Sequence, residues 1–236
     1  MSKSMEALIA SMIASGPAAN RPPHIAFDFF SVMDVSHMLK KLIAAILYTA
    51  LSLGAIPATA LDIEGAEALR EGSMMKLGFH SAPKEVSALS FTDIDGNEET
   101  LADYQGQFVL LNFWATWCAP CRKEMPALNA LSGAFGDQGL TVLPVATGHN
   151  PLPAIKSFFE KAEVEHLPVR LDSKGAMARD MGVLGLPVSI LISPEGKEIA
   201  RMTGDAEWFS PSAQAIITHI LEKDSAQPSD VSQESN

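Results

Sequence analysis

Residues 108–126 decide the fold and read FVLLNFWATWCAPCRKEMP. The first seven, Phe108–Trp114, are nearly all apolar, which indicates a buried β-strand. Further on, apolar residues recur at helical spacing, at Met125, Leu128, Leu131 and Phe135. The spacing predicts a helix that begins near Cys118 and runs to about Phe135. The stretch therefore joins a buried strand to a helix, and both cysteines of the chain lie at the junction.

The two cysteines, Cys118 and Cys121, lie in the first turn of this predicted helix. Pro120 is tolerated there, because the first N–H groups of a helix have no partner within the helix. The same unpaired N–H groups, together with the helix dipole, favour a thiolate at Cys118. Cys121 follows on the same face and can close a disulfide with it. The pair indicates redox exchange, with Cys118 as the attacking nucleophile and Cys121 as the residue that resolves the mixed disulfide.

Two other interpretations of the pair compete with redox exchange. A structural zinc site needs four ligands, and the chain has no second cysteine pair. The histidines lack the spacing of metal ligands, so no metal is expected; the four considered are His80, His149, His166 and His219. A purely structural disulfide is the second competitor, although so short a loop constrains the unfolded chain little. A catalytic dithiol is favoured over both.

Composition limits the class of protein. A chain of 236 residues that is 47% hydrophobic can hold one globular domain of ordinary size with extensions. Its formal net charge is −11 and it has no basic block, so nucleic acid is not expected as a partner. Two cysteines cannot make a disulfide scaffold.

The N-terminal part indicates export. Residues 1–37 show no sustained hydrophobic periodicity. They are treated as an uncertain extension, which an overlong gene prediction would explain. Residues 38–60 are predicted to be a secretory signal, with Lys40 and Lys41, an uncharged apolar run and a small-x-small cleavage site. The alternatives are an uncleaved anchor over residues 42–61, long enough to cross a bilayer, and an internal apolar helix in a chain that starts at Met1. All three interpretations place the residues after about 61 outside the cytoplasm.

The remaining residues alternate between strands and helices. Residues 61–86 are expected to be a leading segment with a short helix over 62–77, and residues 224–236 a disordered tail. The expected strands are 87–91, 98–101, 108–114, 140–146, 166–171, 188–192 and 198–202. The expected helices are 118–135, 151–161, 176–181 and 210–222. This order predicts one α/β domain over residues 87–223, a mixed sheet flanked by helices with an N-terminal β-hairpin.

The motif resembles that of a known family. Residues 117–121, Trp-Cys-Ala-Pro-Cys after a strand, resemble the thioredoxin superfamily, and the longer run 112–126 resembles its TlpA/ResA branch of exported or membrane-anchored bacterial proteins. The resemblance covers about residues 87–221 and includes Gly-Val-Leu-Gly-Leu-Pro at 182–187. It implies a thioredoxin-like fold and thiol:disulfide oxidoreductase activity. It also implies that a Cys118–Cys121 disulfide serves as the redox group and that no cofactor is needed.

The resemblance also implies substrate-binding residues. Pro187 matches the family's cis-proline, which faces the dithiol and leaves the backbone of Leu186 free to pair with a substrate strand. Trp117 would shield Cys118 and contact the client protein, beside Pro120. The alternatives are a trans Pro187 that merely starts a strand and a Trp117 that belongs to the core.

Glu124 is the third candidate catalytic residue. Thioredoxins carry a buried aspartate in the central strand, and this chain has Asn112 there, which does not titrate. In the TlpA/ResA branch a glutamate three residues after the second cysteine takes part of that role, and Glu124 matches it. A buried Glu124 would raise the thiol pKa values and take up protons during exchange. The alternative is a solvated glutamate in the first helical turn.

The resemblance implies an exported, periplasmic reductase. Its clients would be cysteine pairs of apoproteins in cytochrome c maturation or in copper-site assembly of respiratory oxidases, and a membrane thiol carrier of the DsbD/CcdA type would re-reduce it. An oxidase or isomerase remains the first alternative, because the sequence does not fix the reduction potential. The second is a thioredoxin-like copper chaperone, for which copper binding would depend on His149.

Overall fold

The structure is a computed structural model that describes residue 40 and residues 62–225. Contacts divide the chain into two units, Met1–Pro57 and Ala58–Asn236, and the first contributes only the helical, exposed Lys40 to the description. The predicted extension and, apart from Lys40, the signal or anchor segment lie outside the described residues. In the described part, no helix combines the length and hydropathy that a membrane span requires.

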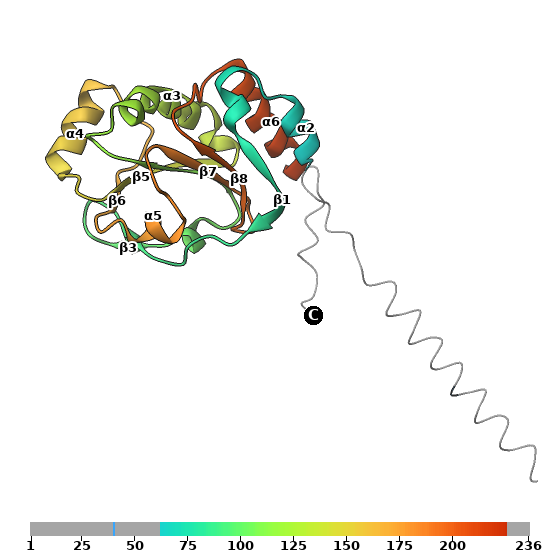
Figure 1. The fold of residues 1–236 in the computed structure, drawn as a ribbon, viewed down its shortest axis with the longest axis horizontal. Coiled ribbons are helices and arrows are strands. Elements are labelled where there is room, and N and C mark those ends of the chain that lie inside the picture. Colours follow the sequence, from blue (N-terminus) through green and yellow to red (C-terminus); the bar gives the residue numbers. More distant parts are fainter. Residues whose placement is uncertain (1–39, 41–61, 226–236) are drawn as a thin grey trace, which may run out of the picture. The chain divides into compact units, whose positions relative to one another are not determined.

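One mixed sheet of eight strands organises residues 62–225, in the order β1-β8-β7-β4-β5-β6-β2-β3 (Figure 1). The central strand β4 runs parallel to β5 and antiparallel to β7. The strands are β1 (Gly78–Lys84), β2 (Phe91–Thr92), β3 (Glu98–Glu99), β4 (Phe108–Trp114), β5 (Leu140–Thr147), β6 (Arg170–Asp172), β7 (Val188–Ile192) and β8 (Glu198–Thr203).

Helices cover both faces of this sheet. The α-helices are α2 (Ile63–Ala68), α3 (Ala119–Phe135), α4 (Leu152–Lys161), α5 (Ala176–Asp180) and α6 (Pro211–Ser225). Short 3₁₀ turns connect them, at η1 (Gly72–Lys76), η2 (Leu101–Tyr104) and η3 (Gly136–Gln138). The predicted α/β fold, a mixed sheet flanked by helices, is confirmed.

The alternation of side chains along β4 separates two apolar cores. Leu110 and Trp114 pack in one core with α2, α3, α4 and α6, whereas Leu111 and Phe113 pack in the other with α5. Asn112 lies two residues from both Leu110 and Trp114, so its side chain points to the same face of the sheet, the one that α3 covers. The alternation along β4 therefore brings the Asn112 amide to Glu124 on α3.

The structure departs from the predicted elements at both ends of the sheet. Strand β1 lies where no strand is expected and pairs antiparallel with β8, so residues before 87 belong to the sheet. The first hairpin is present, but β2 begins at Phe91 instead of residue 87. Residues 62–77 form α2 and η1 with a break between them, and β6 contains only the end of the stretch predicted over 166–171.

The predicted disordered tail also starts too early. Asp224 and Ser225, its first two residues, lie in α6. The remaining part of that prediction, residues 226–236, lies outside the described residues.

Candidate active site

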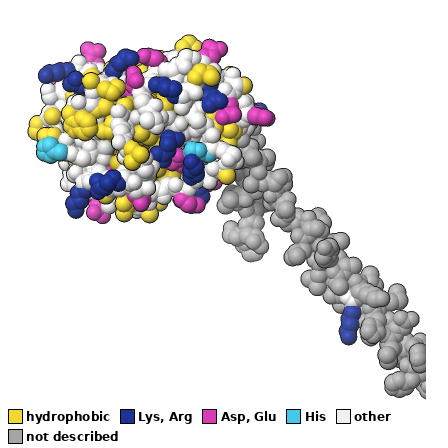
Figure 2. Space-filling view, in the orientation of Figure 1, with side chains coloured by type: hydrophobic (Ala, Val, Ile, Leu, Met, Phe, Trp, Pro, Cys, Tyr) yellow, Lys and Arg dark blue, Asp and Glu magenta, His cyan; other side chains and the backbone are white. Residues whose placement is uncertain are grey.

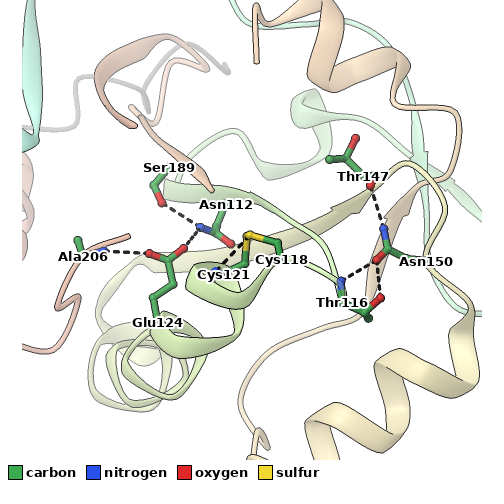
Figure 3. Close-up of a disulfide and its surroundings, with 9 residues drawn as sticks. All are labelled: Asn112, Thr116, Cys118, Cys121, Glu124, Thr147, Asn150, Ser189 and Ala206. Atoms are coloured by element: carbon green, nitrogen blue, oxygen red, sulfur yellow. Dashed lines mark hydrogen bonds between the residues drawn. A yellow bond between two sulfur atoms is a disulfide. The ribbon is translucent and has the colours of Figure 1, made fainter. Parts of the chain in front are cut away.

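Cys118 and Cys121 form a disulfide at the N-terminus of α3, with their Cα atoms 5.3 Å apart (Figure 3). Cys118 is the N-cap residue, and its Sγ accepts the backbone N–H of Cys121 at 3.3 Å. Cys118 keeps 6% of its surface exposed and Cys121 none. A client sulfur can therefore reach Cys118, and a thiolate there would be stabilised by the N–H of Cys121 and by the positive end of the helix dipole.

A hydrogen-bonded asparagine fixes the turn that leads into Cys118. Oδ1 of Asn150 accepts the backbone N–H of Thr116 at 2.8 Å and its hydroxyl at 3.0 Å. Nδ2 of Asn150 donates to the carbonyl oxygen of Thr147 at the end of β5, at 2.9 Å (Figure 3). Asn150 thus connects the turn after β4 to the end of β5 by hydrogen bonds. It was not predicted as a site residue, and its only signal was an asparagine shortly after a predicted buried strand.

Glu124 lies buried one turn beyond Cys121, with 2% of its surface exposed. Its Oε1 accepts from Nδ2 of Asn112 at 2.8 Å, and its Oε2 accepts the backbone N–H of Ala206 at 3.1 Å (Figure 3). Burial raises the pKa of Glu124 from 4.5 to about 7, against the opposing effect of these hydrogen bonds. The alternative of a solvated Glu124 is wrong.

Two polar atoms near this carboxylate are buried without a hydrogen-bond partner. One is Nε1 of Trp208, whose indole lowers the pKa of Glu124 although it makes no hydrogen bond. The other is Oδ1 of Asn112, whose Nδ2 also donates to the hydroxyl of Ser189 at 3.0 Å. In Figure 3 the unpartnered oxygen points toward the side of the disulfide. The site therefore has an unused acceptor beside the cysteines.

The predicted substrate-binding residues differ in exposure. Trp117 is 69% exposed, so the alternative of a core aromatic is wrong. The bond between Leu186 and Pro187 is cis, as the resemblance implied, while Pro187 is buried and Leu186 half-buried. Pro120 is exposed in the first turn of α3.

Leu184, which was not predicted as a site residue, is fully exposed in the loop before the cis bond. The sequence indicated this exposed residue only by placing an apolar side chain in a loop between Gly182 and Gly185. His149 is exposed after β5. In residues 62–225 no three or more His, Cys, Asp or Glu side chains gather so that they could hold a metal ion.

Comparisons with known proteins agree with this geometry. The AhpC/TSA family model matches residues 82–200. The thiol-disulfide oxidoreductase ResA of Bacillus thuringiensis subsp. konkukian is 35% identical over 122 residues, which cover 52% of this chain and 69% of the relative. ResA of Bacillus subtilis strain 168 is also 35% identical, over 140 residues, which cover 59% of this chain and 71% of the relative.

Solved structures show the same likeness. A putative thiol:disulfide interchange protein DsbE from Chlorobium tepidum superposes with a TM-score of 0.53 at 29% identity, over 59% of this chain and 96% of that one. A putative thioredoxin from Neisseria meningitidis superposes with a TM-score of 0.51 at 26% identity, over 61% of this chain and 95% of that one. These likenesses support the thioredoxin-like fold.

Proposed function

Because the chain belongs to the AhpC/TSA family and is a thiol–disulfide oxidoreductase of the ResA type, we propose that it is a reductase of oxidised cysteine pairs in exported proteins. One observation carries the proposal. The buried carboxyl group of Glu124 follows the Cys118–Cys121 pair by one helical turn, with a pKa of about 7.

The reaction needs only the two cysteines and the client. In the reduced protein, the Cys118 thiolate attacks one sulfur of the client disulfide and displaces the other as a thiolate, which takes up a proton. Cys121 then gives up its proton, and its thiolate attacks the sulfur of Cys118 in the mixed disulfide. The Cys118–Cys121 bond closes and the second client thiolate leaves and is protonated. Two electrons and two protons have passed to the client.

Glu124 is the group that would accept the proton of Cys121. A carboxylate with a pKa of about 7 is half ionised near neutral pH, so it can take a proton in one half of the cycle and release it in the other. Cys121 is wholly buried and water does not reach it freely, which makes an internal acceptor useful. Glu124 and Asn112 share a hydrogen bond on the face of α3 that carries Cys121.

The same carboxylate favours the reducing direction. A dithiol becomes a strong oxidant when its reduced form, as a thiolate, is strongly stabilised. An ionised Glu124 near the cysteines acts against such stabilisation, because like charges raise the thiol pKa. We therefore expect a low reduction potential, and we assign the protein to client reduction rather than to disulfide donation.

Export is the remaining part of the proposal. The signal-like or anchor-like residues 38–60 would carry the domain out of the cytoplasm, to the periplasm. A reductase in an oxidising compartment must be re-reduced, so the proposal includes a membrane thiol carrier of the DsbD/CcdA type. Its clients would be the cysteine pairs of cytochrome c precursors or of oxidase copper-site proteins.

The reduction potential of the Cys118–Cys121 pair, measured by equilibration with glutathione, tests the direction. A value near or below roughly −200 mV, in the range of glutaredoxins and thioredoxin, is expected for a reductase. A value near about −120 mV would instead make the protein a disulfide donor, as in the oxidase or isomerase alternative.

A further inference from the structure

A groove runs beside the reactive cysteine, between the turn before α3 and the helix α4. It has a volume of about 380 Å³. Thr116, Trp117 and Arg122 form one side, and Ala154, Ser157, Phe158 and Lys161 of α4 form the other. Thr116 and Trp117 directly precede Cys118, so a chain lying in this groove passes next to the accessible sulfur.

The groove carries positive charge without compensation. Its lining contains Arg122 and Lys161 and no acidic residue. Neither cation forms an ion pair within residues 62–225, whereas the neighbouring Lys123 pairs with Asp205 at 3.3 Å. The chain as a whole has a net charge of −11. On the face drawn in Figure 2, acidic and basic side chains lie interspersed. The charged residues that line the groove are all basic.

Aromatic side chains line the rest of the groove. Trp117 is 69% exposed, an unusual state for a tryptophan with nothing to cover it. Phe158 is half-buried and leans on the buried Trp114, with 5.7 Å between the ring centroids. The ring of Phe158 is therefore held in place by the core and offers a rigid apolar surface. Two free cations beside two aromatic rings fit a polypeptide that presents carboxylates next to apolar groups.

We propose that this groove binds an acidic segment of the client protein, one that flanks the client's reactive cysteine. The inference rests on the proposed function and adds the class of client to it. Carboxylates of the client would pair with Arg122 and Lys161 while its apolar groups cover Phe158 and Trp117. The pairing would orient the client disulfide toward Cys118.

Lys161 is the better residue for the test. Arg122 lies in the first turns of α3, where a change of charge would also alter the thiolate at Cys118. Lys161 ends α4 and belongs to a different element. Lys161→Glu therefore reverses one groove charge without altering the helix that carries the cysteines. Lys174→Glu is the matched control, since it makes the same change of net charge at another exposed lysine, one that does not line the groove.

The first measurement separates binding from redox chemistry. The full-length oxidised chain is titrated with two peptides of equal length that contain no cysteine, one rich in glutamate and one with lysine in its place, while tryptophan fluorescence is recorded. We expect the glutamate peptide to bind at least about fivefold tighter, as one or two exposed ion pairs allow. Lys161→Glu should remove or invert this preference, Lys174→Glu should keep it, and added salt should weaken it.

Equal binding of the two peptides to the unchanged protein would overturn the inference, as would an equal loss of preference in both lysine variants. The proposed function is tested separately, by reduction of versions of the same peptides that contain a disulfide. Failure to reduce either peptide would count against the proposed function. A normal rate on both, without charge preference, would count against the groove alone.

Discussion

Nδ2 of Asn112 donates a hydrogen bond of 2.8 Å to Oε1 of Glu124 and so joins the central strand to the helix that carries both cysteines. Both side chains are buried. Burial and hydrogen bonding act in opposite directions on the carboxyl group, because burial disfavours its charged form and the donated hydrogen bond favours it. The pKa of about 7 is the balance of the two, and each side of that balance can be tested by substitution.

Asn112→Val should raise the pKa of Glu124 above 7. The substitution keeps a side chain of similar size and removes the donor that lowers the pKa. Titration of the Glu124 carboxyl carbon by NMR in the oxidised protein measures the shift. Ser189→Ala is the control, since it removes the other partner of Asn112 without touching the carboxylate. A pKa that stays at 7 or falls in Asn112→Val would contradict the assignment.

Glu124→Gln should flatten the dependence of stability on pH. The folded carboxyl group holds its proton up to about pH 7, and the unfolded one only up to about pH 4.5, the ordinary pKa of a glutamate. The folded state thus binds more protons between these values, so the free energy of unfolding should fall as pH rises from about 4.5 to about 7. The contribution is about 3 kcal/mol.

Denaturant unfolding of the oxidised protein at several pH values measures this slope. In Glu124→Gln the fall should be absent, whatever the absolute stability of the variant. The glutamine itself should cost about 1–3 kcal/mol, because its amide group faces a donor, either Asn112 or the backbone of Ala206. A slope equal to that of the unchanged protein would show that Glu124 is not the group that titrates.

Cys118→Ala should abolish turnover, whereas Cys121→Ala should trap a mixed disulfide between Cys118 and the client. The difference follows from exposure, since a client sulfur can reach Cys118 and not the wholly buried Cys121. Non-reducing electrophoresis after incubation with an oxidised client separates the two variants. Normal turnover by Cys121→Ala would contradict the two-cysteine mechanism.

Trp117→Ala should weaken client binding and leave folding stability within about 0.5 kcal/mol, because the side chain is mostly exposed. Trp114→Ala is the contrasting variant. Trp114 is buried and stacks on Phe159 at 5.7 Å between centroids, so its loss should cost about 3–5 kcal/mol. Thermal unfolding and client reduction kinetics together check the pair. A large stability loss in Trp117→Ala would show that this side chain supports the fold.

Asn150→Ala should destabilise the protein by about 1–3 kcal/mol, because the backbone N–H of Thr116 loses its acceptor. Asn150→Asp keeps the acceptor and loses the bonds to the carbonyl oxygens of Thr147 and Gly148, so it should cost less. Denaturant unfolding ranks the two variants, and the rate of disulfide exchange should fall in the same order if the turn positions Cys118. An Asn150→Asp variant less stable than Asn150→Ala would reverse this explanation.

Local sequence predicted the parts of the site that lie close together in the chain. Strand β4 was predicted with its observed bounds, because six of its seven residues are apolar, which indicates a buried strand before the helix start. The Cys118–Cys121 disulfide was also predicted from local sequence, because the two cysteines lie three positions apart at the start of a predicted helix. Cis Pro187 and buried Glu124 came from the resemblance, since neither spacing nor composition indicates them.

The missed features depend on contacts between distant residues. Strand β1 contains Gly78 and Pro83 and lacks alternation, and it becomes a strand by pairing with β8, more than a hundred residues later. The contacts of Glu124 with Ala206 and of Thr116 with Asn150 also join separate elements. No local pattern could have indicated these hydrogen bonds.

The complete burial of Cys121 beside a nearly buried Cys118 also limits chemical damage. A peroxide that reaches the reduced protein would meet Cys118 first and convert it to a sulfenic acid. The thiol of Cys121, close enough to have formed the disulfide, would condense with it and release water before a second oxidation could produce the irreversible sulfinic acid. The outcome is the same disulfide that client reduction leaves behind, so exposure to oxidants would return the protein to a normal state of its cycle.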